Sequence, residues 1–441
     1  MLTQVMRPVP TDVGVRMADA RLPRPFSQGL EFNAPVHGTW NIVHTGMLVP
    51  EAHQVYVCAE NCVRGVVMTA AEMGELDRFS LVALDEKNLV AGDLERFTID
   101  GVADVLAKLD ELPPVVLLFL VCVHRFTGCD VAYVMRTLRG RFPGVDFVEC
   151  WMDPIRQKEH LTPEQELRAS MYDPLRPCPH QERVVDVLGS DFALDDTADL
   201  LGLARDAGCE VRQVQGCATY ADYQHLAEAQ LMVCTYPTAR HGIEALAGRL
   251  GADLLYLPGS FSYDEIAHGI DALADGLEMA HPDCTDLRAA ADDALDQARE
   301  ALAGLPVAID QNVHPRPLGL ARLLLEHGFD VRWAFLDAVR PDETDDAAWL
   351  VEHAPDLMLY PMVQARMRTR PRGGEGDVLA IGQWAAWALD TPHFVDMVEG
   401  GGLWGFDGIR HLARLMVEAV ATEKDTKALV QRKGLGCASC L

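Results

Sequence analysis

The chain has 441 residues, of which 49% are hydrophobic and 24% charged, a globular composition that excludes a mainly disordered protein. Aspartate and glutamate number 66 against 38 lysines and arginines, so the formal net charge is −28. Such a surface repels phosphate backbones and anionic lipid, and we expect no nucleic acid and no membrane among its partners.

Residues 1–40 carry prolines at positions 8, 10, 23, 25 and 35, and we expect an irregular N-terminal arm that wraps over a partner or over the body of the protein. The start of the chain lacks the apolar core that a signal peptide needs. The most apolar run, Val115–Val123, is too short to cross a bilayer and has the length of a buried strand. We therefore expect a cytoplasmic protein.

From Asn41 onward, apolar strand-like runs alternate with segments of helical period, which is typical of α/β architecture with parallel sheets. The length of the repeating unit predicts three Rossmann-like domains with parallel sheets flanked by helices. We place these domains at residues 41–180, 181–280 and 281–441, the last with a C-terminal tail. The seams fall near Arg176–Glu182 and in the charged, alanine-rich helical stretch Ala280–Ala303.

Twelve cysteines are spread over the chain, and no nucleotide-binding glycine motif joins a strand to a helix. In a cytosolic protein such cysteines are buried thiols, metal ligands or reactive groups before they are disulfides. The sharpest pattern is Cys58-Ala-Glu-Asn-Cys62, a spacing that presents two thiolates to one site. Cys122 ends the most apolar strand, where α/β folds place ligands. Thiolates favour iron–sulfur clusters, zinc or copper, and plain burial of each thiol stays the alternative.

These segments, taken in order, resemble the component 1 subunits of nitrogenase and nitrogenase-like reductases. Those chains carry an early cysteine turn, a Glu-Lys segment, and a strand-ending cysteine that leads into a helix. The resemblance covers roughly residues 41–421, and its most specific parts surround Cys122 and Gly405–Gly408. The matching segments are Asn41–His44, Cys58–Cys62, Phe79–Lys87, Val121–Asp130, Val187–Asp191, Leu231–Cys234 and Gly402–Ile409.

The resemblance implies an iron–sulfur cluster, 4Fe-4S or larger, close to an interface between subunits. By position its ligands would be Cys62 and Cys122, with Cys58 as the third. The family's earlier cysteine has no counterpart, because no Cys precedes residue 58. A fourth ligand would come from Glu60, from solvent, from a partner chain or through a larger shared cluster. The implied partners are a second copy or a homologous component 1 subunit, and an ATP-dependent iron–sulfur reductase.

Cys234 stands about where molybdenum nitrogenases hold their active-site cofactor by one thiolate, so we expect a cofactor-binding role there, with burial in a strand as the alternative. The histidine that the resemblance implies before Gly405 is absent from Phe394–Leu403. Whether a second metal cofactor is bound therefore stays open. Two further motifs are the basic segment Arg366–Gly376, a solvated loop or a lid for an anionic group, and the tail pair Cys437 and Cys440.

Three functions remain in view. The first is a nitrogenase-like reductase, an oxidoreductase component whose cluster relays electrons to an unidentified substrate. The second is a scaffold on which a complex metal cofactor is assembled without turnover. The third is a non-redox binding module whose cysteines are buried or hold zinc.

Overall fold

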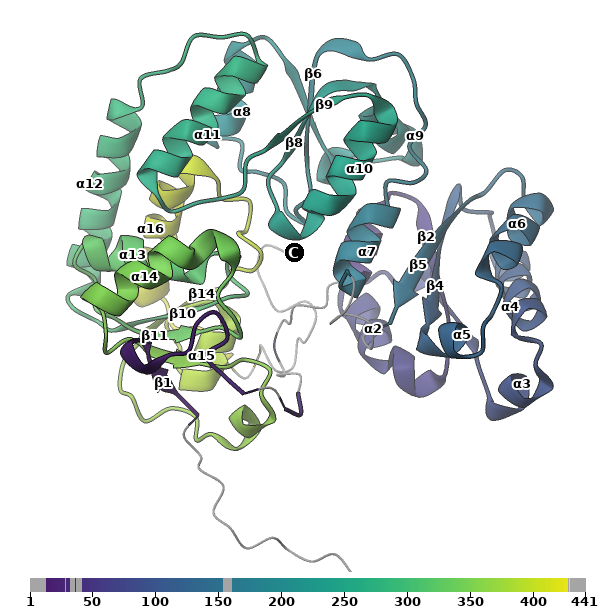
Figure 1. The fold of residues 1–441 in the computed structure, drawn as a ribbon, viewed down its shortest axis with the longest axis horizontal. Coiled ribbons are helices and arrows are strands. Elements are labelled where there is room, and N and C mark those ends of the chain that lie inside the picture. Colours follow the sequence, from purple (N-terminus) through teal and green to yellow (C-terminus); the bar gives the residue numbers. More distant parts are fainter. Residues whose placement is uncertain are drawn as a thin grey trace, which may run out of the picture. The chain divides into compact units, whose positions relative to one another are not determined.

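A computed structural model describes residues 13–27, 29–31, 36, 42–153, 161–426 and 428. In this part of the chain the strands form three sheets, whose strands run parallel except for one at an edge (Figure 1). Helices flank the sheets, so the predicted α/β architecture of parallel Rossmann-like sheets is confirmed. None of the described helices is both long and apolar enough to span a membrane.

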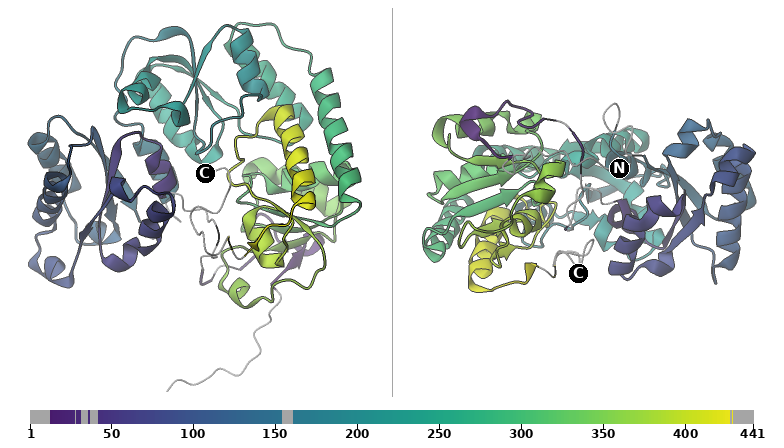
Figure 2. Two further views of the ribbon diagram at one scale, coloured as in Figure 1. Left: turned by 180° about the vertical axis from the view of Figure 1, so that it is seen from behind. Right: turned by 90° about the horizontal axis from the view of Figure 1, so that it is seen from below.

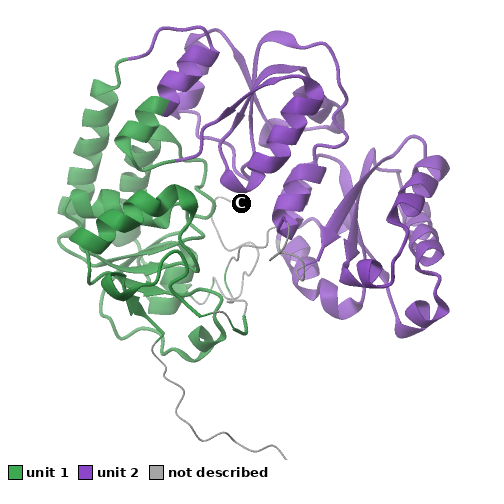
Figure 3. Cartoon of the chain, viewed as in Figure 1, with its two compact units in different colours: residues 1–38, 260–268, 283–441 green, residues 39–259, 269–282 purple. Residues whose placement is uncertain are grey.

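The chain divides into two compact units, coloured separately in Figure 3. Unit 1 comprises residues 1–38, 260–268 and 283–441, and unit 2 comprises residues 39–259 and 269–282. Unit 2 holds the first two sheets and unit 1 the third. The exact domain boundaries 40/41, 180/181 and 280/281 stay a prediction.

The first sheet of unit 2 has the order β3-β2-β4-β5, with all neighbouring strands parallel. All seven residues of its central strand β4 are apolar and buried, as a strand covered on both faces requires. The strands are β2 (Ala52–Cys58), β3 (Phe79–Ala83), β4 (Val115–Val121) and β5 (Asp146–Met152). The helices around it are α1 (Ile42–Met47), α2 (Glu60–Glu72), α3 (Glu86–Ala91), α4 (Leu94–Lys108), α5 (Cys122–Phe126), α6 (Val131–Arg141) and α7 (Pro163–Ser170).

The second sheet repeats this order as β7-β6-β8-β9, again all parallel. Its helix α10 packs on α7 so closely that a β-carbon at Gly242 would lie 2.6 Å from the Cα of Ala169. One buried apolar cluster therefore runs from the first sheet into the second, from Phe119 through Met171 to Met232. The elements are β6 (Gln181–Leu188), α8 (Asp199–Asp206), β7 (Glu210–Gln213), α9 (Tyr220–Gln224), β8 (Ala229–Cys234), α10 (Arg240–Leu250), β9 (Asp253–Tyr256) and α11 (Tyr263–Gly276), whose first turns belong to unit 1.

The third sheet, in unit 1, has the order β1-β12-β11-β10-β13-β14. Strand β1 comes from the N-terminal arm and pairs antiparallel with β12, so the arm is not irregular throughout: part of it is an edge strand of the protein's own sheet. The remaining neighbours are parallel. The strands are β1 (Val15–Arg16), β10 (Val307–Asp310), β11 (Val331–Phe335), β12 (Met358–Tyr360), β13 (Leu379–Ile381) and β14 (Phe394–Val395).

Two long helices of unit 1, far apart in sequence, lie side by side, as the view from behind shows (Figure 2). The predicted alanine-rich helix is α12, whose buried stripe Ala291, Leu295, Ala298 and Leu302 has helical spacing. Small residues in that stripe let the partner α16 approach closely. The helices of this unit are α12 (Thr285–Leu302), α13 (Pro317–Glu326), α14 (Thr344–His353), α15 (Gln383–Leu389) and α16 (Gly405–Ala421).

Candidate functional site

Three of the predicted ligands lie at the carboxyl edge of the first sheet. Cys58 is the last residue of β2, Cys62 lies in the first turn of α2, and Cys122 is the first residue of α5, directly after β4. Strands β2 and β4 are neighbours in a parallel register that sets Tyr56 beside Phe119. The loops that carry the thiols therefore leave the sheet at the same edge, where α/β folds bind ligands.

The three thiols differ in exposure. Cys58 is buried, Cys122 is half-buried and Cys62 is exposed. Burial raises the pKa of Cys58 to about 12, and the charge of Cys62 adds to the effect. Burial also raises the pKa of Cys122, with smaller contributions from the charges of Asp153 and Cys62. The charge of Cys62 thus acts on both other thiols.

Three thiols are the kind of donor set that iron–sulfur clusters use. Among the described residues, no group of three or more His, Cys, Asp and Glu side chains is arranged to hold one metal ion. The irons of a cluster each take their own thiolate, so the ligands surround the core and need not meet at one point. Cys58 would enter such a site only by losing its proton, and coordination to a metal deprotonates a thiol. The ligand roles of Cys58, Cys62 and Cys122 stay predictions.

An ion pair with a buried acid and a half-buried arginine lies beside Cys122. Asp153 directly follows β5, and its carboxylate lies 3.1 Å from Nε of Arg125 on α5. The Arg125 guanidinium also lies over the ring of Trp151, 3.6 Å from the centroid, and 3.8 Å from Glu166. Of the two carboxylates that Arg125 contacts, Asp153 is the more deeply buried: 3% of its side chain is exposed, against 23% for Glu166.

Cys234 ends β8, as predicted, but on the second sheet and inside the core. Its residue is 0% exposed, and its thiol donates to the carbonyl oxygen of Tyr236 at 3.5 Å. Burial raises its pKa to about 12. In this structure the thiol is therefore a protonated core group, and its role as a cofactor ligand stays a prediction.

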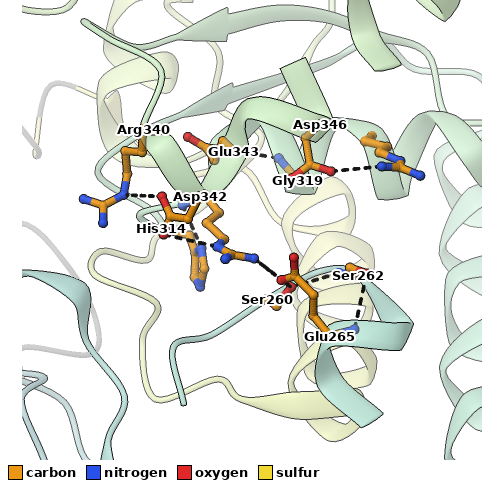
Figure 4. A network of polar contacts seen from close by, with 11 residues as sticks. Ser260, Ser262, Glu265, His314, Gly319, Arg340, Asp342, Glu343 and Asp346 are labelled. Carbon is orange, nitrogen blue, oxygen red and sulfur yellow. Dashed lines mark hydrogen bonds and ion pairs between the residues drawn. The ribbon is translucent and has the colours of Figure 1, made fainter. Parts of the chain in front are cut away.

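A second polar cluster lies at the carboxyl edge of the third sheet, within unit 1 (Figure 4). Buried Arg316, in the loop after β10, pairs with Glu265 and lies 3.5 Å from Asp342, which also pairs with Arg340 at 3.1 Å. His314 accepts a hydrogen bond at Nδ1 from the backbone N–H of Arg316. Burial, together with the charges of Arg316 and Arg340, lowers the pKa of His314 to about 3, so its ring is neutral.

Buried carboxylates fix the loops of this edge. Asp337 accepts hydrogen bonds from the backbone N–H groups of Met362 and Val363, at 2.9 and 3.1 Å. Glu343 accepts from Leu318 at 2.7 Å, at the start of α13, and burial raises its pKa to about 7 against the effect of that bond. These acids hold the edge in one geometry and hence act as structural groups.

An open pocket of about 290 Å³ adjoins this cluster. Arg288 and Arg322 face it, but each already pairs with a carboxylate: Arg288 with Asp264 at 3.1 Å, Arg322 with Glu326 at 3.0 Å. Both arginines are therefore neutralised by carboxylates of the lining, which holds three carboxylates against two arginines. Its lining is Phe261, Ser262, Tyr263, Asp264, Arg288, Gly319, Arg322, Leu323, Glu326, His327 and Asp346.

The sequence patterns do not predict a site around His314 and Arg316. The available signal was the polar run Asp310–Arg316 directly after an apolar strand, which places it at a ligand-binding edge. Glu265, the partner of Arg316, is 51 positions away in the sequence, and no local pattern connects the two residues.

The basic segment Arg366–Gly376 follows β12. Arg366, Arg368 and Arg372 are exposed, whereas Arg370 lies over the ring of Tyr360 at 4.7 Å. The segment is therefore partly anchored, and contact with an anionic group stays a prediction. Cys437 and Cys440 lie outside the described residues.

The solved structures that are similar to most of this chain include two of nitrogenase. "Nitrogenase Cp1 at pH 6.5" matches with a TM-score of 0.65 and 12% identity, covering 90% of this chain and 94% of its own. "Nitrogenase Cp1 at pH 5" matches with a TM-score of 0.55 and 12% identity, covering 90% and 91%. No protein-family model matches the sequence, and a search of curated proteins finds no similar sequence. At this identity the likeness concerns the fold, which is nitrogenase-like.

Proposed function

We propose that this chain is a component 1 subunit of a nitrogenase-like reductase. It would take electrons from an ATP-dependent iron–sulfur protein through a cluster held by Cys58, Cys62 and Cys122, and pass them to a substrate whose identity stays open. The observation that carries the proposal is the position of three thiols at the ends of two neighbouring strands, in a nitrogenase-like fold.

The bound cluster would supply one-electron transfer. The residues of the chain would set its surroundings. Cys58 is buried and would lie on the core side of the cluster, and Cys62 is exposed and would leave the other side accessible to solvent. That opening admits a ligand from a second copy or from a homologous component 1 subunit. Glu60, exposed in the first turn of α2, is the ligand that the chain itself offers on that side. The charge of −28 suits a reductase that docks by a basic face.

The first experiment tests for the cluster. The full chain is purified without oxygen and loaded with iron and sulfide. Brown protein with stoichiometric iron and sulfide is the expected result, and Cys58→Ala, Cys62→Ala and Cys122→Ala should each lose at least half of the bound iron. Cys209→Ala, a half-buried thiol after α8, is the matched control and should keep it. Colourless protein that binds only zinc would support the non-redox binding module instead.

The second experiment separates turnover from a scaffold role. A reductase component should hydrolyse ATP in step with substrate loss when mixed with the iron–sulfur reductase. A cofactor scaffold would hold the cluster without that coupling.

Cys234 as the anchor of a second metal cofactor is a separate part of the proposal. Cys234→Ser keeps a donor for the Tyr236 carbonyl, so the fold should persist. Loss of substrate reduction with an unchanged cluster spectrum would support the anchor role, and full activity would make Cys234 a packing residue.

A further inference from the structure

The register of the first sheet sets a carboxylate beside one predicted cluster ligand. Strands β4 and β5 are parallel and pair Val121 with Met152. The next residues along the two strands are Cys122 and Asp153, so both leave the sheet at neighbouring positions of the same edge. Asp153 is 4% exposed, and so its charge is poorly screened by water.

The carboxylate forms an ion pair with a half-buried cation. Arg125 lies three residues after Cys122 on the short helix α5, 3.1 Å from the Asp153 carboxylate. Its guanidinium carbon lies over the Trp151 ring, 3.6 Å from the ring centroid. Contacts with Asp153, Glu166 and Trp151 thus restrain the guanidinium, and at low dielectric such charges act strongly on a nearby redox group.

We propose that the Asp153–Arg125 ion pair tunes the reduction potential of the cluster, and that its two charges act on the potential in opposite directions. The inference rests on the proposed function, because it presupposes a cluster at Cys58, Cys62 and Cys122. Reduction adds one electron to the cluster, with no bond made or broken, and the electron comes from the iron–sulfur reductase or from a chemical reductant. The Asp153 charge disfavours the reduced form and lowers the potential, and the Arg125 charge opposes it.

The test is a potentiometric titration of the cluster-loaded full chain, with iron and sulfide counted in every sample. Asp153→Asn should keep its iron and shift the oxidised-to-reduced ratio at a fixed potential about tenfold toward reduced, which equals about 59 mV for one electron. Arg125→Gln should shift the ratio the other way, and Arg125→Lys, which keeps the charge, should shift it less than Arg125→Gln.

Asp100→Asn is the matched control, because Asp100 on α4 belongs to an exposed ion pair with Arg141 on α6, at 3.0 Å. It should leave the ratio unchanged. Equal ratios in Asp153→Asn and the parent chain, or shifts of the same sign in Asp153→Asn and Arg125→Gln, would overturn the inference. So would loss of iron from Asp153→Asn, which would make Asp153 a ligand. A parent chain that takes up no iron and sulfide overturns the proposed function as well, which distinguishes the two failures.

Discussion

The carboxylate of Asp310 occupies the space that a β-carbon at Gly382 would need. Asp310 ends β10 and Gly382 follows the neighbouring strand β13, with φ at 114°, where side chains are strained. The carboxylate accepts hydrogen bonds from the backbone N–H groups of Asn312 at 3.0 Å and Ala385 at 2.9 Å. One buried acid thus joins the loop after β10 to the first turn of α15 at the carboxyl edge of the third sheet.

We expect Gly382→Ala to destabilise unit 1 by about 2–4 kcal/mol, because strain and overlap with Asp310 act together. Gly374→Ala is the control: its φ is 92°, but no atom lies within 4 Å of the added carbon, so only backbone strain of about 1 kcal/mol applies. Urea unfolding followed by tryptophan fluorescence measures both. Equal losses in the two variants would contradict the role of Asp310.

Much of the fold could be predicted because its signals are local. The seven apolar residues Val115–Val121 indicate a buried strand by themselves, and Cys122 follows as a residue at its carboxyl end. Strand β1 could not be predicted in this way. It has two residues in a proline-rich arm, and only its pairing with β12 makes it a strand.

The polar cluster around His314 and Arg316 at the third sheet could not be predicted for the same physical reason. Asp310 and Ala385 are 75 residues apart, and Arg316 and Glu265 are 51 apart. Such pairs depend on the order of strands in a sheet, which periodicity does not determine. The sequence likewise does not determine the burial of Cys234, because a strand-ending thiol can point into the core or out of it.

Asp186 gives a prediction about pH. It lies in the middle of β6, 0% exposed, and among the described residues neither of its side-chain oxygens has a hydrogen-bond partner. Burial raises its pKa well above the usual range, against the opposing charge of Arg212. The folded state therefore keeps a proton that the unfolded chain loses above about pH 4, and stability falls as the pH rises.

Asp186→Asn should remove this pH dependence, since an amide does not titrate. The thermal midpoint of the parent chain should fall relative to that of the variant between about pH 5 and pH 8. Asp196→Asn is the control, because the Asp196 side chain is fully exposed, and its profile should follow the parent. Parallel profiles for Asp186→Asn and the parent would mean that Asp186 does not carry the proton.

Arg168 holds together the junction of the two sheets in unit 2. Its side chain is 1% exposed and contacts Glu164 at 2.9 Å, Asp191 at 2.8 Å and the carbonyl oxygen of Gly189 at 2.7 Å. Arg168→Met removes the cation but leaves two largely buried carboxylates without it, which should cost about 3–5 kcal/mol. Calorimetry of the full chain should show a lower melting temperature for the transition of unit 2.

The control for Arg168→Met is Arg141→Gln, which breaks an exposed pair with Asp100. Surface pairs contribute about 0–1 kcal/mol, so this variant should melt close to the parent. A small effect of Arg168→Met would show that the carboxylates of Glu164 and Asp191 find water or protons easily.

Thiol exposure gives the last prediction, on the chain without metal. Cys62 is exposed, whereas Cys58 and Cys234 are buried with pKa values raised to about 12. Only a thiolate within reach of solvent reacts with a maleimide, so Cys62 should be labelled first and the other two only after unfolding in guanidinium. Peptide mass spectrometry at increasing times measures each thiol separately. Loading the chain with iron and sulfide should then protect Cys62, because a cluster would occupy its sulfur. Early labelling of Cys234 in the native chain would mean that its thiol reaches solvent, which would favour its predicted role as a cofactor anchor over packing in the core.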